Sequence, residues 1–230
     1  MFEEKKVIHT KRLLMRKPLI EDTDQFYSII KEDAVGKWLA KSSGMSKEEA
    51  KDYVIQLISH WEQYDFGVWL VVNRNTDKLL GHCGLRKIDE TGEIEIMYLL
   101  DPEYWGNGYA SEAAKASIQY AKEMMNEKRI IARVKVENEN SKKLLRNLGF
   151  TYTHDVDHSG RLLSYFELKT SLDKLYTFFM FFNCLKIKLL LKFQCEMYVE
   201  SCIINVFLWK HFLVLNIGLN RTRKEIHTCI

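Results

Sequence analysis

Three β-rich segments lie close together in the middle of the chain, and their spacing limits the fold more than any other feature. The segments are rich in aromatic and β-branched side chains and span residues 66–72, 79–88 and 93–100. The turns between them, residues 73–77 and 89–92, are far shorter than the dozen or more residues that a parallel crossover needs. The sequence therefore predicts an antiparallel meander and disfavours a doubly wound dinucleotide-binding domain.

Helical patterns flank this meander on both sides. Ser46 followed by Glu49 forms a capping box, and Asp22 followed by Gln25 suits another helix start. We expect a strand near residues 12–19 before these helices. After the meander, we expect helices over residues 111–125 and 141–148 and strands over residues 130–136, 150–152 and 162–168. Together these elements predict a mixed α/β (α+β) domain, with a mostly antiparallel sheet flanked by helices.

Composition divides the chain near residue 170. Residues 1–170 hold 26 Lys and Arg against 27 Asp and Glu, whereas residues 171–230 hold 8 against 4. Four of the five cysteines and none of the nine alanines lie in the second part. The net charge of +3 thus belongs to the last 60 residues, and a basic nucleic-acid-binding face on the first part is not expected. We predict one domain over residues 1–170 and an atypical apolar, basic tail over residues 171–230.

Three interpretations of the tail stay open. Its composition is typical of translated AT-rich sequence beyond a normal stop codon or after a frameshift. A membrane anchor over residues 203–219 is the second, although Lys210 and His211 near its centre oppose insertion. A small helical subdomain is the third. Residues 1–6 contain no apolar run of a signal peptide, and the unpaired cysteines suit a reducing compartment, so we expect a cytoplasmic protein.

The segment from Tyr98 to Ala113 is the strongest candidate site. A strand ends, a loop with Gly106 and Gly108 follows, and an alanine-rich helix begins. Free amides at a helix start bind anions, so residues 105–111 predict a phosphate or pyrophosphate site, with an ordinary glycine turn as the alternative. The loop lacks the Gly-Lys-Ser/Thr of a P-loop, and Ser111 replaces the third glycine of a dinucleotide fingerprint.

A second polar segment follows the strand predicted at residues 130–136. Asn138 lies at the strand end, with Asn140 or Ser141 as a predicted helix cap and Gly149 as the helix stop. Simple loop or cap duty is the alternative for Asn138. The histidines show no metal-ligand spacing, so we expect polar surface or strand positions for them and no metal site.

These two segments together resemble the GNAT superfamily of acetyl-CoA-dependent N-acetyltransferases. Residues 105–110, Asn138-x-x-Ser141 and Leu148-Gly149-Phe150 match its two motifs in order. Residues 10–16 and 95–98 are similar to the branch of RimJ/RimL-type ribosomal-protein acetyltransferases. The resemblance covers roughly residues 8–168. It implies the GNAT fold, in which two central strands of the sheet splay apart and acetyl-CoA binds as co-substrate.

The resemblance also implies roles for individual residues. Glu95 matches the general base, Asn138 would orient water or the pantetheine, and Ser141 would protonate the leaving thiolate. The usual helical tyrosine acid is replaced by Leu145, and Trp105 stands where the family has Gln or Arg. The implied acetyl-CoA contacts are Tyr98, Leu99, Leu100, Trp105, Gly106, Asn107, Gly108, Tyr109, Ala110, Ser111, Asn138 and Ser141.

The implied acceptor is a primary amine, either a protein N-terminal α-amine, a polyamine or another small amine. Lys37, Trp38 and Met45 are candidate specificity residues, with helix packing as the alternative for Trp38. The competing functions are a non-catalytic acetyl-CoA-binding or interaction protein and a membrane-tethered acetyltransferase. We expect no nucleic-acid partner and no membrane partner, and the sequence leaves open whether the chain forms a homodimer.

Overall fold

The antiparallel meander predicted from the short turns is present in a computed structural model, which describes residues 6–170. Eight strands form one sheet in the order β1-β2-β3-β4-β5-β6-β8-β7, and every neighbouring pair except β5–β6 is antiparallel. The strands are β1 (Ile8–His9), β2 (Leu13–Arg16), β3 (Val68–Asn73), β4 (Leu79–Lys87), β5 (Ile94–Leu100), β6 (Arg129–Lys135), β7 (Thr151–Asp157) and β8 (Leu162–Lys169).

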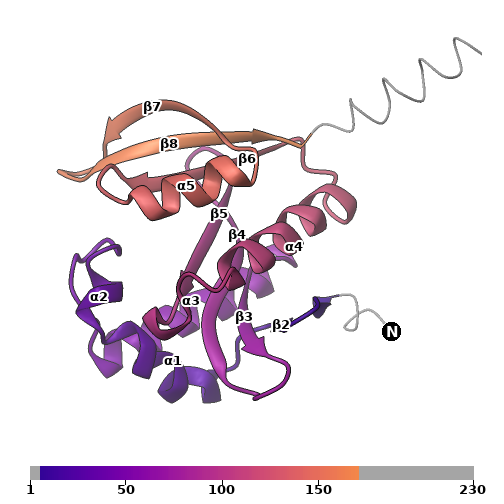
Figure 1. Cartoon of the computed structure of the whole chain (residues 1–230), viewed down its shortest axis with the longest axis vertical. Helices are drawn as coiled ribbons and strands as arrows, with labels where there is room; N and C mark the ends of the chain where they lie inside the picture. The colour runs from indigo at the N-terminus through magenta and orange to yellow at the C-terminus, as the bar shows by residue number, and fades with distance from the viewer. Residues whose placement is uncertain (1–5, 171–230) are drawn as a thin grey trace, which may run out of the picture. The chain divides into compact units, whose positions relative to one another are not determined.

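Helices cover both faces of this sheet. The helices are α1 (Thr23–Ile30), α2 (Asp33–Gly36), α3 (Lys47–Tyr64), α4 (Tyr109–Glu123) and α5 (Glu139–Asn147), with 3-10 turns η2 (Ile20–Asp22) and η3 (Pro102–Tyr104). Figure 1 shows α4 and α5 on the near face of the sheet and α1 and α3 behind it. The predicted fold class, a mixed mostly antiparallel sheet flanked by helices, is confirmed.

Local sequence signals explain several helix ends. The Ser46 side chain accepts a hydrogen bond from the Glu49 amide at 3.2 Å, and the Glu49 carboxylate accepts one from the Ser46 amide at 2.7 Å. Gly149 has a φ of 91°, as expected for the residue that ends α5. The predicted cap of α5 was wrong, because Asn138 caps this helix and Asn140 lies inside it. The short elements β1 and α2 carry no clear periodicity and were not predicted.

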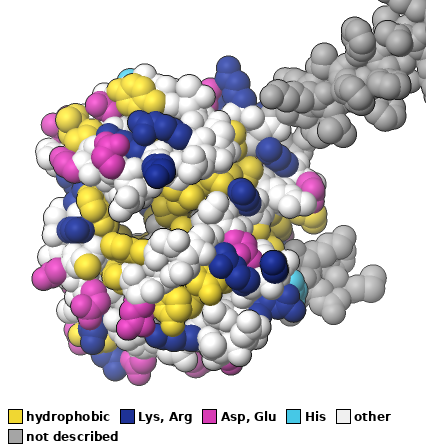
Figure 2. Space-filling view, in the orientation of Figure 1, with side chains coloured by type: hydrophobic (Ala, Val, Ile, Leu, Met, Phe, Trp, Pro, Cys, Tyr) yellow, Lys and Arg dark blue, Asp and Glu magenta, His cyan; other side chains and the backbone are white. Residues whose placement is uncertain are grey.

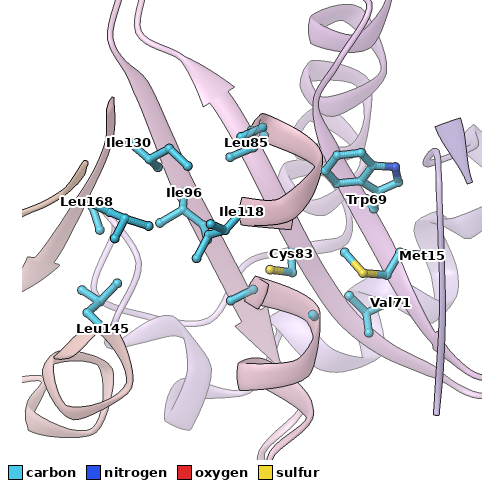
Figure 3. Close-up of a cluster of buried hydrophobic side chains, with 14 of the residues drawn as sticks. Met15, Trp69, Val71, Cys83, Leu85, Ile96, Ile118, Ile130, Leu145 and Leu168 are labelled. Atoms are coloured by element: carbon cyan, nitrogen blue, oxygen red, sulfur yellow. The ribbon is translucent and has the colours of Figure 1, made fainter. Parts of the chain in front are cut away.

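Two hydrophobic clusters hold the helices to the sheet. One lies mainly between α4, α5 and the sheet and includes fully buried Trp69, Leu85 and Ile130, as Figure 3 shows. The other joins α1 and α3 to the opposite face and includes fully buried Phe26 and Leu70. Burying each large apolar side chain contributes about 1.5–3 kcal/mol, so both helix layers are firmly anchored.

The only parallel pair in the described sheet opens a cleft. β5 and β6 pair at Ile94↔Ile130 and Glu95↔Ile131 and then diverge, although each strand continues for several more residues. The predicted splay of two central strands is therefore present. It removes the neighbour from one edge of β5 and leaves backbone groups there free to bind another molecule.

The predicted tail, residues 171–230, and the anchor considered at residues 203–219 lie outside the described residues. The division into a domain and a tail therefore stays a prediction. Among the residues that the structure describes, no helix is both long and apolar enough to cross a bilayer.

Candidate active site

A cavity of about 970 Å³ lies at the splay between β5 and β6. Its walls come from β5, the loop before α4, the start of α5, β6 and the segment around α2. Figure 2 shows this face hollowed between the parts that contain α5 and α1, with hydrophobic side chains gathered along the hollow. Among the predicted site residues, all except Asn107 line the cavity.

The glycine loop presents free amides to this cavity. Gly106 and Gly108 have φ values of 77° and 78°, which glycine adopts without the strain that a Cβ adds. Within residues 6–170, no backbone amide from Gly106 to Ser111 donates a hydrogen bond to a protein acceptor. These amides lie at the positive end of the α4 dipole. The loop therefore has the donors and the charge of an anion site, as its sequence predicts.

The edge of β5 offers backbone groups for a ligand with amide bonds. The Asp101 amide bonds to the Leu80 carbonyl at 2.8 Å, which fixes the alternation of hydrogen bonds between β4 and β5. By this alternation, Leu99 directs its backbone toward β4, whereas Tyr98 directs its N–H and C=O into the cleft. The Leu100 carbonyl is already occupied by the Trp105 indole N–H at 2.7 Å. Tyr98 is thus the main backbone contact available here.

Arg12 supports the loop from outside the cavity. Its guanidinium donates to the Glu112 carboxylate at 2.7 Å and to the Asn107 carbonyl at 2.9 Å, and it lies 4.2 Å from the centre of the Tyr109 ring. Burial alone would raise the pKa of Glu112, but hydrogen bonds from Thr10 and Arg12 lower it. Arg12 therefore neutralises a carboxylate in the first turn of α4 and holds the Asn107 carbonyl, and Asn107 does not line the cavity.

Glu95 is buried and held by two arginines. Arg133 donates to both carboxylate oxygens at 2.8 Å, and Arg86 donates to one of them at 2.6 Å. Burial alone would raise the pKa of Glu95, but the hydrogen bonds and charges of Arg133 and Arg86 lower it below its usual value. The carboxylate is therefore ionised at neutral pH, and its proton affinity is lower than that of a free glutamate.

The start of α5 lies across the cleft from β5. The Asn138 side-chain oxygen accepts a hydrogen bond from the Ser141 amide at 3.1 Å. Asn138 therefore caps α5, which was the alternative interpretation of this residue. The Tyr98 hydroxyl donates to the Ser141 carbonyl at 3.4 Å and ties β5 to α5. Burial raises the pKa of Tyr98. Leu145, which stands where the resemblance implies a tyrosine acid, is fully buried in the core.

His82 was expected at a polar surface or strand position, and it lies in strand β4 but is buried. It is 1% exposed, lines the cavity and pairs through Nε2 with the Tyr53 hydroxyl at 3.0 Å. Burial lowers the pKa of His82 to about 3, so its ring is neutral. Its Nδ1 has no partner within residues 6–170. Histidine in a strand pattern gives no sequence signal for such a position.

Of the three candidate specificity residues, Trp38 and Met45 line the cavity and Lys37 does not. The Lys37 carbonyl instead accepts from Lys135 at 2.5 Å. Arg86, Arg133 and Arg161 also line the cavity and were missed from the sequence. The tight turn at residues 89–92 places Arg86 opposite Glu95 and was a usable signal for that pair, whereas no local signal identifies Arg133 or Arg161.

No cluster of three or more His, Cys, Asp or Glu side chains among the described residues is placed to hold a metal ion. The site consists instead of free amides, an open strand edge and a buried ion-paired carboxylate. An open sheet with these features at its splayed strands is the arrangement of an N-acetyltransferase that uses acetyl-CoA.

Comparison with known proteins gives the family. Residues 12–151 match the model of the acetyltransferase (GNAT) domain, and the chain belongs to this family of N-acetyltransferases. It is 33% identical over 173 residues to an uncharacterized N-acetyltransferase, p20, of Bacillus licheniformis, covering 74% of this chain and 93% of that protein.

Two solved structures share the fold. A GNAT-family acetyltransferase from Bacillus anthracis has a TM-score of 0.63 and 24% identity, over 71% of this chain and 98% of that one. RimL, an L7/L12 α-N-protein acetyltransferase solved with coenzyme A, has a TM-score of 0.60 and 18% identity, over 71% and 97%. At these identities the structures show the fold alone, and membership of the RimJ/RimL-like branch is a proposal.

Proposed function

We propose that this chain transfers the acetyl group of acetyl-CoA to a primary amine within a ternary complex. The observation that carries the proposal is the cleft between β5 and β6, where free amides of the glycine loop and the open edge of β5 meet one continuous cavity. Free amides suit the pyrophosphate, and the strand edge suits the amide-bearing pantetheine arm. The cavity leaves room beside Glu95 and Trp38 for an acceptor.

The proposed acetyl-CoA contacts combine these two parts of the site. Tyr98 provides backbone hydrogen bonds, and the amides of residues 106–111 hold the pyrophosphate. Asn138 and Ser141 lie at the start of α5 across the cleft, where Ser141 has a side-chain hydroxyl without a partner among the described residues. Acetyl-CoA supplies an acetyl group activated as a thioester. The protein's own contribution is to bind, to orient and to move protons.

In the proposed reaction, the amine nitrogen forms a bond to the acetyl carbon while the carbon–sulfur bond breaks. The nitrogen loses one proton to a base, and the thiolate gains one proton from an acid, so the balance closes. Glu95 is the proposed base, acting through water, and Ser141 is the proposed acid. Because Arg86 and Arg133 weaken Glu95 as a base, we propose that they also help directly, since nearby positive charge lowers the pKa of a bound ammonium.

The test of this function is binding and transfer with a matched glycine control. Gly106 and Gly92 have φ values of 77° and 71°, and a Cβ at either position meets nothing within 4 Å. Gly106→Ala and Gly92→Ala should therefore each cost about 1 kcal/mol of stability through backbone strain alone. Only Gly106→Ala should also weaken acetyl-CoA binding, about tenfold or more, because it shifts the loop that carries the free amides.

The measurements are thermal unfolding with acetyl-CoA and release of coenzyme A with an amine panel. At 100 times its dissociation constant, acetyl-CoA should raise the melting temperature of the wild type by about 5 °C or more. No shift at millimolar acetyl-CoA would refute the proposed function, as would equal loss of binding in both glycine variants. The cytoplasmic location and the oligomeric state stay predictions.

A further inference from the structure

The charges that line the cavity are unbalanced. Five basic side chains face it and only one acidic side chain, Glu95; the basic ones are Arg86, Arg133, Lys135, Lys143 and Arg161. Residues 1–170 as a whole hold 26 basic and 27 acidic residues. The excess of positive charge is therefore a property of the cavity, and the average composition of the domain does not account for it.

Most of this charge lies on the side of the cleft around Glu95 and Trp38, where we place the acceptor; we call this the acceptor side. Arg86 and Arg133 both contact Glu95, and Lys135 follows Arg133 by two residues on β6 and so lies on the same face of the sheet. Lys135 is paired with Leu163 of β8, and Arg161 precedes Leu163 by two residues. Two of these basic side chains contact Glu95, and the other two, Lys135 and Arg161, lie further along the same wall of the cavity.

The ligand phosphates do not explain this group. The free amides of residues 106–111 are the proposed ligands of the pyrophosphate. Lys143 lies on α5, which packs on the same face of the sheet as α4. Glu95 balances one of the four positive charges on the acceptor side. The Arg161 guanidinium has no hydrogen-bond or ion-pair acceptor among residues 6–170, although its backbone amide donates to the His158 carbonyl. Burial and then the charge of Arg161 lower the pKa of Lys135, whereas the charge of Glu137 raises it, so Arg161 lies close enough to Lys135 to affect it.

We propose that the acceptor of this enzyme is a small amine that also carries an anionic group, a carboxylate or a phosphate, and that Arg161 binds that group. The proposal rests on the proposed function and names its substrate class. A guanidinium without a partner binds both anions through paired hydrogen bonds. A polyamine, one of the acceptors left open by the sequence, would instead meet like charge at each of these residues.

The walls of the acceptor side suit a small molecule with an apolar body. Trp38, Leu39 and Met45 provide apolar surface next to the basic group. Lys135 donates to the Lys37 carbonyl at 2.5 Å and to the Ser42 hydroxyl at 2.7 Å, which joins β6 to the segment after α2. The anion therefore fixes the orientation of the acceptor, and the apolar wall binds the rest of it.

The test compares amines that differ only in the anionic group. The panel pairs butylamine with norvaline, phenethylamine with phenylalanine and tryptamine with tryptophan, and 1-amino-2-phenylethylphosphonate separates phosphonate from carboxylate binding. We expect kcat/KM at least tenfold higher for the anionic members. Arg161→Gln should raise KM for the anionic amines and so remove most of this preference. The kcat/KM values of the neutral amines should not change. Lys143→Gln is the matched control and should keep the preference.

A second readout does not depend on turnover. Titration calorimetry of the full chain with coenzyme A present should show N-acetylphenylalanine binding at least tenfold more tightly than N-acetylphenethylamine. Equal affinities and equal rates, tighter binding of the neutral members, or no detectable binding of any anionic member would overturn the proposal, as would an anionic preference that survives Arg161→Gln. Anion binding without any effect of acetyl-CoA would refute the proposed function and leave the anion site standing.

Discussion

At the scale of single residues, Glu95 depends most on its neighbours. In the sequence, Glu95 is a carboxylate on a predicted strand, and the pattern does not distinguish an exposed position from a catalytic one. The fold buries it to 5% exposure and surrounds it with Arg86 and Arg133. A buried carboxylate without partners would have a raised pKa and serve as a strong base, whereas these two guanidinium groups reverse the direction of the shift.

Glu95→Gln tests both its structural and its catalytic role. At pH 7 the variant should lose about 2–3 kcal/mol of unfolding free energy, because Arg133 keeps a partner but loses the charge-assisted hydrogen bonds. If Glu95 is the base, kcat should also fall at least tenfold and the acid limb of its pH profile should disappear. Urea unfolding and kcat against pH measure the two effects.

The pH dependence has a defined sign. The folded-state pKa of Glu95 lies below the usual value of 4.5, so its contribution to stability is complete above that pH. It is lost as the pH falls through the folded-state pKa, and the difference between wild type and variant should shrink there. Glu93→Gln is the control, since Glu93 pairs with the more exposed Arg129 and should change stability by less than about 1 kcal/mol. Unchanged turnover in Glu95→Gln would remove Glu95 as the base.

At the scale of elements, the start of α4 is positioned from a distant part of the sequence. Arg12, next to β2, neutralises Glu112 in the first turn of α4 and holds the loop through the Asn107 carbonyl. The glycines give the loop its shape, and this contact neutralises the Glu112 carboxylate in the first turn of the helix. The proposed anion site therefore depends on both the N-terminal hairpin and the helix.

Arg12→Gln should weaken acetyl-CoA binding by about three- to tenfold, because Glu112 would then present an uncompensated charge beside the pyrophosphate site. Arg129→Gln is a matched control, since Arg129 also pairs with carboxylates, those of Glu93 and Glu167, on another part of the sheet. Calorimetric titration with acetyl-CoA measures the effect. Equal affinity in Arg12→Gln and wild type would show that the contact is structural only.

At the scale of the whole molecule, the described elements are consistent with the domain boundary predicted near residue 170 from composition. The described members of both hydrophobic clusters lie between Ile8 and Leu168, and the Thr170 amide donates to the Lys128 carbonyl at 2.8 Å. Seven strands in addition to the short β1 complete one sheet before this point.

A chain that stops after Thr170 should therefore unfold in one cooperative transition and keep the stabilisation by acetyl-CoA that the full chain shows. Thermal unfolding of both chains with and without acetyl-CoA measures this, and the full chain is the reference. Loss of the cooperative transition, or loss of the acetyl-CoA effect, would show that residues 171–230 contribute to the fold. That outcome would also contradict the predicted domain boundary.

The sequence by itself determined the features that depend on neighbours along the chain. Short turns allow only antiparallel pairing, the Ser46–Glu49 box starts a helix, and Gly106 with Gly108 shapes an anion-binding loop. The tertiary structure alone decided the features that join distant segments. The arginines around Glu95, the contact of Arg12 with Glu112 and the buried position of His82 all arise where strands and helices meet in space. The charges and pKa values at the site depend on these tertiary contacts, and no local sequence pattern predicts them.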